Sequence, residues 1–153
     1  MAYFQPIIFK LNEEMYGMNI LNVSGIENGH KIIRVPNSSG DIKGIINLRG
    51  DVIPVVNLKA KFGMPYDSNM DSETLIIAKT STNIIALEVD AVEKIYNLEE
   101  ADVVNMPVIA KGNGVYYLNK VAKINDKLVI MVDPDKLLSE EESAAVQELA
   151  NAK

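Results

Sequence analysis

Runs of apolar, mostly β-branched residues recur about every ten residues along the chain, and short clusters of turn-forming residues separate them. Ile and Val are enriched in strands, and short strands at regular spacing are typical of a sandwich or a barrel. In the first run Ile7, Phe9 and Leu11 alternate with other residues, so they share one face of a predicted strand. The pattern therefore predicts a mainly β fold.

The same pattern predicts three hairpins and one further strand. They comprise 42–48 with 52–58, 74–80 with 83–90, 120–124 with 127–133, and the strand 31–36. In the first hairpin Gly50 can adopt the positive φ that a tight turn needs, and Asp51 can bond to nearby backbone.

Several of these runs are apolar at consecutive positions, as in 128–132. A strand of this kind is either covered on both faces, or covered on one face while the other binds a partner. A chain of 153 residues has little room to cover many strands on both faces. We therefore expect apolar outer faces that bind partners.

Length and composition exclude several classes of protein. The 153 residues fit one domain, or two small subdomains that share a core. The absence of Cys excludes a disulfide-built module and a thiolate metal site, and the net charge of -6 makes nucleic acid an unsuitable partner. Neither a signal peptide nor an apolar run of about 18 residues is present, so we expect a soluble cytoplasmic protein.

Few residues suggest catalysis. His30 is the only histidine, and no partner for a hydrolytic triad is evident. The enzymatic alternative is a small β-barrel enzyme acting through Asp90, Asp133 or Asp135. However, Asp133 before Pro134 is also a helix N-cap pattern, which gives it a structural role. We predict no catalytic residue, no metal site and no cofactor.

The tripeptide Arg49-Gly50-Asp51 has two interpretations. As a cell-adhesion ligand it requires export, for which the sequence shows no signal. As the turn of a hairpin it forms a rigid platform that presents Arg49 and its apolar neighbours to a partner. The absence of a signal peptide favours the second interpretation.

The C-terminal region contains a predicted helix and part of an internal echo. Ser139 and Glu142 form a capping-box pattern, which predicts a helix over about 139–152. Residues 47–63 and 123–139 both follow the order turn, strand, short helix. This echo suggests two similar β units, although it is too short to establish a repeat by itself.

Three segments together resemble a known family. They are YGMNILNVSGI at 16–26, IKGIINLRGDVIPVVNLKAKFG at 42–63 and IIALEVDAVEKIYNL at 84–98. Their sequences, order and spacing are similar to those of the CheW-like domain family, the bacterial chemotaxis coupling proteins, over about residues 4–140. The middle segment also resembles the regulatory domain of the chemotaxis kinase CheA, but that protein is far larger.

The resemblance implies a single CheW-like domain over 1–153, with two intertwined five-stranded SH3-like β-barrels, short helices and a core between the barrels. It implies a scaffold without catalysis. Such proteins couple the cytoplasmic tips of methyl-accepting chemotaxis proteins to the regulatory domain of the histidine kinase CheA, and support receptor arrays. The expected location is the cytoplasm, with recruitment to membrane receptor arrays and no direct membrane insertion.

By position, the resemblance also implies two sets of binding residues. The groove for the receptor tip would be lined by Val23, Ile26, Gly44, Leu48, Arg49, Gly50 and Ile95. The kinase-facing surface would include Ile32, Val52 and Leu75. An apolar groove suits a helical partner such as a receptor tip. For the three kinase-facing residues, ordinary core is the alternative.

One position departs from the family pattern. Members often carry Glu where this chain has Gly25, and the resemblance implies that this Glu pairs with the residue equivalent to Arg49. Two alternatives follow for this chain. Glu27 substitutes as the carboxylate, or Arg49 points toward the partner instead.

Overall fold

Two β-sheets make up most of the fold in the computed structural model, which describes residues 3–35, 42–66, 74–81, 83–105 and 120–137. The first sheet has the order β10 (Ala91–Ile95), β2 (Pro6–Leu11), β3 (Glu14–Asn19), β14 (Lys127–Met131), β13 (Lys120–Ile124) and β12 (Val103–Asn105). The second has the order β4 (Val23–Asn28), β8 (Thr74–Lys79), β9 (Ile84–Val89), β7 (Asp51–Asn57), β6 (Ile42–Leu48) and β5 (Ile33–Arg34).

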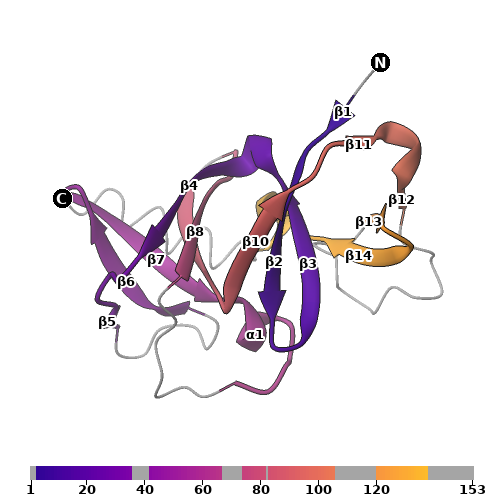
Figure 1. Cartoon of the computed structure of the whole chain (residues 1–153). Coiled ribbons are helices and arrows are strands. Elements are labelled where there is room, and N and C mark those ends of the chain that lie inside the picture. The colour runs from indigo at the N-terminus through magenta and orange to yellow at the C-terminus, as the bar shows by residue number, and fades with distance from the viewer. Residues whose placement is uncertain (1–2, 36–41, 67–73, 82, 106–119, 138–153) are drawn as a thin grey trace.

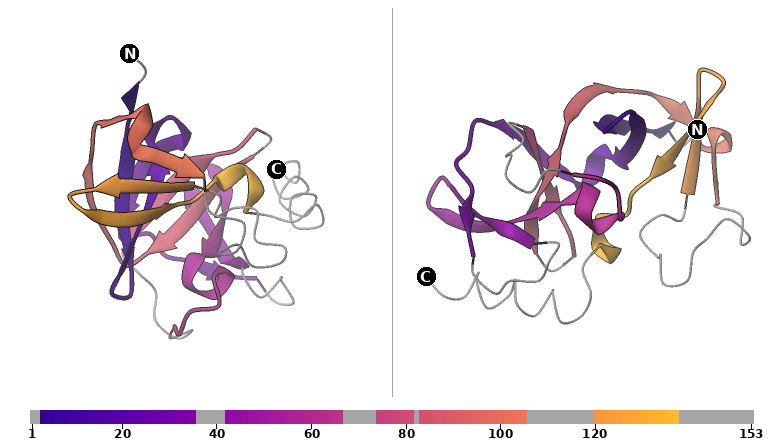
Figure 2. Two further views of the ribbon diagram at one scale, coloured as in Figure 1. Left: turned by 90° about the vertical axis from the view of Figure 1, so that its right-hand side faces the viewer. Right: turned by 90° about the horizontal axis from the view of Figure 1, so that it is seen from below.

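Short elements complete the described part of the chain. They are the pair β1 (Tyr3–Phe4) and β11 (Leu98–Glu99), the helix α1 (Leu58–Lys61), and the 3-10 turns η1 (Ile20–Asn22), η2 (Glu100–Asp102) and η4 (Pro134–Lys136). Figure 1 and the right-hand view of Figure 2 place the β6–β7 hairpin at one end of the molecule and the β13–β14 hairpin at the other. The mainly β class and all three predicted hairpins are confirmed.

The second sheet is formed by consecutive strands, β4 to β9, whereas the first takes its strands from both sides of that segment. The chain leaves the first sheet after β3 and returns to it at β10, which pairs with β2. β4 and β10 each lie at an edge of their sheet. The chain therefore crosses between the sheets twice, and the expected intertwining of two barrels stays a prediction.

The internal echo is also confirmed, and its two copies are related by an offset of 76 residues (125 − 49 = 76). Arg49 and Gly50 have positive φ in one turn, as Asn125 and Asp126 have in the other. At the same offset, the side chains of Asn57 and Asp133 cap the short helices α1 and η4. The two units therefore share local geometry from the turn to the helix.

Three clusters of buried side chains stabilise the fold. The central core lies between the sheets and takes side chains from both, including Phe9, Met18, Val56, Ile76 and Leu87. The β6–β7 core comprises Ile32, Ile46, Leu48, Ile53, Val55, Leu75, Ile77 and Ala86. The β13–β14 core comprises Ile8, Leu98, Ala122, Ile124, Val129 and Met131.

These clusters correct one expectation. Most strands that are apolar on both faces are covered on both faces, because each sheet contributes one face to the central core and buries the other over a core of its own. On β14, Val129 and Met131 are buried in the β13–β14 core and Ile130 packs against the central core, whereas Leu128 is 71 % exposed. Among the described residues, the exposed large apolar side chains are therefore single positions on otherwise covered strands and turns.

Other expectations differ in detail or are not tested. Five-stranded barrels were expected, but each sheet has six strands, and no pairing among the described residues joins its two edge strands. The strand predicted at 31–36 is limited to Ile33–Arg34. The helix predicted at about 139–152 lies outside the described residues. Within the described part of the chain, none of the helices is both long and apolar enough to cross a membrane.

Candidate partner-binding surface

The tip of the β6–β7 hairpin is a tight turn that holds Arg49 at the surface. Arg49 and Gly50 have φ values of 51° and 91°, and positive φ at both central residues defines the type I′ turn of two-residue hairpins. The Gly50 N–H donates to Asn47 Oδ1 at 2.8 Å. The Arg49 side chain is 77 % exposed. The backbone of Arg49 is thus fixed while its guanidinium remains accessible.

Glu27 is the carboxylate that contacts Arg49. Arg49 Nη2 lies 3.3 Å from Glu27 Oε2, and His30 Nε2 lies 2.8 Å from Glu27 Oε1. The hydrogen bond from His30 is the main reason that the pKa of Glu27 lies below its usual value, and the positive charge of Arg49 adds to this lowering. Of the two alternatives for Arg49, the structure favours substitution by Glu27.

The contact between Glu27 and Arg49 also reports on the shape of the second sheet. Glu27 is on β4 at one edge, whereas Arg49 follows β6, and β8, β9 and β7 lie between these strands in the sheet order. A contact of 3.3 Å across that separation requires the sheet to curl. Leu75, the register partner of Glu27, belongs to the β6–β7 core. The ion pair therefore lies at the rim of the curled sheet.

The alternation of side chains along β4 explains how Glu27 replaces a carboxylate at position 25. Residues two apart on a strand share a face. Gly25 and Glu27 pair with Ile77 and Leu75, which both belong to the β6–β7 core. A Cβ atom at Gly25 would meet nothing within 4 Å. Both positions therefore face the same side, and the glycine is not required for packing.

Two edge strands carry the next three predicted receptor-binding residues: Val23 and Ile26 are on β4, and Ile95 is on β10. Val23 packs against the central core, and Ile26 pairs with Ile76 of that core. Ile95 pairs with Ile7, also of the central core. Ile26 and Ile95 are 39 % and 51 % exposed. The three side chains thus extend the core between the sheets toward solvent, at the edges β4 and β10.

Two other predicted receptor-binding residues are buried in the hairpin. Leu48 is 9 % exposed and belongs to the β6–β7 core. Gly44 pairs with Arg34 on β5, and a Cβ atom there would lie 2.2 Å from the carbonyl oxygen of Ile33. Gly44 is therefore explained by the close approach of β5. Leu48 and Gly44 support the hairpin that carries Arg49.

The three predicted kinase-facing residues separate into surface and core. Val52 is 37 % exposed, next to the hairpin tip on β7. Ile32 and Leu75 are 6 % and 1 % exposed and belong to the β6–β7 core. For Leu75 the ordinary-core alternative describes its position in the structure, because almost none of its side chain reaches solvent.

Sequence reasoning did not select several exposed apolar residues. Leu21 is 83 % exposed on η1, where its N–H donates to Asn19 Oδ1 at 3.0 Å. Ile33 is 54 % exposed on β5, and Leu128 is 71 % exposed on β14. For Leu128 a usable signal existed, because the 76-residue echo places it at the position equivalent to Val52. For Leu21 no pattern in the sequence distinguished it from a core residue.

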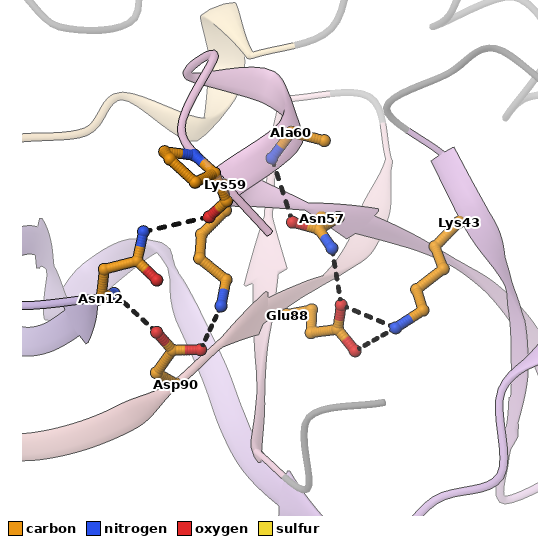
Figure 3. A network of polar contacts seen from close by, with 8 residues as sticks. Asn12, Lys43, Asn57, Lys59, Ala60, Glu88 and Asp90 are labelled. Atoms are coloured by element: carbon orange, nitrogen blue, oxygen red, sulfur yellow. Dashed lines mark hydrogen bonds and ion pairs between the residues drawn. The ribbon is translucent and has the colours of Figure 1, made fainter. Parts of the chain in front are cut away.

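A buried polar network joins the hairpin to the rest of the second sheet (Figure 3). Lys43 Nζ lies 3.1 and 2.9 Å from the two carboxylate oxygens of Glu88. The side chains of Lys43 and Glu88 are only 4 % and 5 % exposed. Asn57 Nδ2 donates to Glu88 at 3.0 Å, while Asn57 Oδ1 accepts from the Ala60 N–H at 3.1 Å. The network links β6, β7, β9 and α1, so it helps to hold the hairpin in place.

The aspartates considered for catalysis have structural contacts. Asp90 accepts from the Asn12 N–H at 2.6 Å and from Lys59 Nζ at 2.8 Å, which ties the β2–β3 turn to α1 (Figure 3). Asp133 caps η4, and Asp135 accepts from the Ser81 N–H. Over the described ranges, no three His, Cys, Asp or Glu side chains are grouped to hold a metal ion. These contacts account for each aspartate without a catalytic role.

Comparisons with known proteins agree with this architecture. The model of the CheW-like domain family matches residues 5–142. The chain is 32 % identical to the chemotaxis protein CheW of Klebsiella aerogenes, covering 95 % of this chain and 88 % of that protein. It is 28 % identical to the chemotaxis protein CheW of Treponema pallidum, with coverage of 97 % and 88 %. The crystal structure of the scaffolding protein TtCheW from Thermoanaerobacter tengcongensis superposes with a TM-score of 0.83 at 29 % identity, covering 92 % of this chain and 97 % of that one.

Proposed function

Since this chain belongs to the CheW-like domain family, we propose that it links the cytoplasmic tips of methyl-accepting chemotaxis proteins to the regulatory domain of the histidine kinase CheA. The family consists of non-catalytic scaffolds of bacterial chemotaxis, and this chain is a coupling adaptor of that kind.

The presentation of Arg49 is the observation that carries the receptor-binding part. A type I′ turn fixes its backbone, Glu27 holds its guanidinium from one side, and most of the side chain is exposed. An Arg whose backbone is fixed by a turn and whose guanidinium is already held on one side loses little conformational freedom when it binds a partner carboxylate. We assign Arg49 as the polar anchor for the receptor tip, with Gly50 as the residue that permits the turn.

Apolar side chains supply the remainder of the proposed receptor surface. Val23, Ile26 and Ile95 continue the central core to the surface, so a helical hairpin can cover them with its own apolar face. Leu48 and Gly44 contribute indirectly, because they pack the hairpin that presents Arg49. A helical partner that contacts both parts would be fixed in orientation by the charge and held by apolar burial.

Val52 is the accessible member of the proposed kinase-facing surface. It lies on the strand that begins immediately after the Arg49 turn, and Ile32 and Leu75 pack in the core of the same sheet. We assign direct kinase contact to Val52, and a supporting role to Ile32 and Leu75. The two partners would then bind to the same hairpin unit, which brings receptor and kinase close together. Recruitment to membrane receptor arrays follows from these two contacts.

The adhesion interpretation of Arg49-Gly50-Asp51 is not part of the proposal. In this hairpin Gly50 is explained by its φ of 91°, and Arg49 contacts Glu27 of the same chain. An Asp51→Val variant that still couples receptor to kinase would separate the interpretations, because adhesion through the tripeptide depends on the carboxylate.

A reconstituted kinase assay with receptor signalling fragments tests the proposal. We expect receptor-dependent kinase activity to require this protein and to be lost with Arg49→Glu. Lys79→Glu is the matched control, because it makes the same change of two charge units at an exposed position on β8 outside the proposed surface. Unchanged folding, checked by circular dichroism, would assign the loss to binding.

Single substitutions of exposed apolar residues separate the two partner surfaces. Ile95→Ser should weaken binding of the receptor fragment only, and Val52→Ser should weaken binding of the kinase only. Ile84→Ser is the control, since Ile84 is 45 % exposed on β9 and lies outside both surfaces. If the wild-type protein binds neither partner at concentrations of tens of micromolar, the proposed function is wrong.

A further inference from the structure

Asp90 is the single residue between β9 of the second sheet and β10 of the first, and the chain bends there. Its N–H donates to the Lys10 carbonyl oxygen at 3.0 Å, and its carboxylate accepts from the Asn12 N–H at 2.6 Å. The same carboxylate accepts from Lys59 Nζ on α1 at 2.8 Å, and Asn12 Nδ2 donates to the Pro65 carbonyl oxygen at 3.1 Å (Figure 3). These five residues form the Asp90 junction, which joins the β2–β3 hairpin of the first sheet to the segment that follows β7 of the second.

The proposed receptor surface takes its apolar residues from both sheets. Ile95 is on β10 of the first sheet, whereas Val23 and Ile26 are on β4 of the second. Their spacing therefore depends on the angle between the sheets. Apolar packing between the sheets is not directional, whereas hydrogen bonds are, so the Asp90 junction helps to set this angle. Val52, the proposed kinase contact, lies over a core of the second sheet alone and does not depend on the angle.

We infer that Asp90 is a positioning residue for the receptor surface, because it sets the direction in which β10 leaves the second sheet and thereby the spacing between Ile95 and Ile26. This inference rests on the proposed function. Ile95 is five positions after Asp90 in the chain. Over a strand of that length, about 16 Å, a rotation of about 5° at Asp90 would move Ile95 by about 1.4 Å. A gap of about 0.5–1 Å already removes roughly a quarter to a half of a van der Waals contact.

Asp90→Asn tests the inference, since Asn keeps an acceptor for the Asn12 N–H but loses the charge that holds Lys59. The apparent affinity for a receptor signalling fragment should fall about three- to tenfold, because only a fraction of the molecules then has the spacing that binds. The affinity for the kinase regulatory domain should not change. Lys59→Met removes the other charge of the pair, should give the same selective loss, and carries the test if Asp90→Asn does not fold. An equal loss of both affinities, or no loss of either, would overturn the positioning role.

Glu93→Gln is the matched control for Asp90→Asn. It also removes one negative charge, and Glu93 is on β10 as well, but its partner Lys10 is on β2 of the same sheet at 3.5 Å. The angle between the sheets does not depend on this pair, so both affinities should stay at the wild-type values. A loss of receptor affinity equal to that of Asp90→Asn would assign the effect to charge alone and overturn the inference.

A measurement on the free protein separates this inference from the proposed function. The chain has no Cys, so Ser24→Cys on β4 and Lys94→Cys on β10 give two exposed sites for spin labels. The distribution of distances between the labels should be broader in Asp90→Asn than in the wild-type background, and unchanged in Glu93→Gln. An unchanged distribution in Asp90→Asn would overturn the inference even if the fragment binds. A broader distribution in a protein whose wild type binds no fragment would support the fixing of the sheets by Asp90 and refute the receptor-binding function.

Discussion

Replacement of Glu88 by Gln tests the role of the buried pair with Lys43. The side chains of Lys43 and Glu88 are 4 % and 5 % exposed, and the carboxylate also accepts from Asn57. Gln keeps the shape of the side chain and one acceptor, so the main change is the loss of the negative charge. Lys43 then stays buried without this carboxylate. Removing one partner of a buried ion pair costs about 3–5 kcal/mol of unfolding free energy.

A loss of that size is large for a single domain. Typical unfolding free energies are about 5–15 kcal/mol, so the substitution should remove about a fifth or more of the total. For a chain of this length each kcal/mol lowers Tm by about 2–4 °C, which gives an expected drop of roughly 6–20 °C. Urea and thermal unfolding can be followed by far-UV circular dichroism, which is suitable because the chain has no Trp.

An exposed ion pair provides the matched control. Lys10 and Glu93 are 3.5 Å apart, and their side chains are 43 % and 42 % exposed. Glu93→Gln should cost only about 0–1 kcal/mol, since exposed pairs contribute little. A double variant, Lys43→Met with Glu88→Leu, should recover most of the lost stability, because an apolar pair of similar volume replaces a buried ion pair at little cost. A loss below about 1 kcal/mol for Glu88→Gln, equal to the control, would refute the reasoning.

Gly44→Ala should lower the unfolding free energy by about 1–3 kcal/mol in the same urea assay, because its Cβ would lie 2.2 Å from the carbonyl oxygen of Ile33. A change within about 0.5 kcal/mol would show that β5 can move aside. Gly25→Glu should change the unfolding free energy by less than about 0.5 kcal/mol, because a Cβ there meets nothing within 4 Å. The NMR signal of the Arg49 guanidinium should shift, since a second carboxylate competes with Glu27. An unchanged signal would show that the new side chain points elsewhere. The folded-state pKa of Glu27 is lowered, so its stabilising contribution is present above the ordinary carboxyl pKa and is lost as the pH falls through the lowered value. Between about pH 7 and 3, Glu27→Gln should therefore lose less unfolding free energy than the wild type. Equal losses in the two proteins would argue against this linkage.

Local sequence patterns determined the elements of this protein. The alternation of Ile7, Phe9 and Leu11 predicted the strand that they form, and small or polar residues marked the turns of the three hairpins. Asp133 before Pro134 predicted the cap of η4. These features depend on interactions between residues within a few positions of one another, which is why the sequence alone contains them.

The resemblance to a family supplied candidate residues, but only the tertiary structure separated surface from core among them. Ile26 and Ile95 reach solvent, whereas Leu48 and Leu75 are buried in the β6–β7 core. In an apolar run a surface position and a core position can carry the same residue type. The difference arises from which strand covers which face, and Ile26 is on β4, at the edge of the second sheet.

The charged contacts were decided by the tertiary structure for the same reason. Arg49 and Glu27 are 22 residues apart, and Lys43 and Glu88 are 45 apart. No local spacing pairs residues at these separations. The pairing of β4 with β8 and the curl of the second sheet bring the carboxylate of Glu27 to the guanidinium of Arg49. The sequence by itself therefore determined a turn that exposes an arginine, and the fold decided which carboxylate holds it, because that choice depends on strand pairing over long distances in the chain.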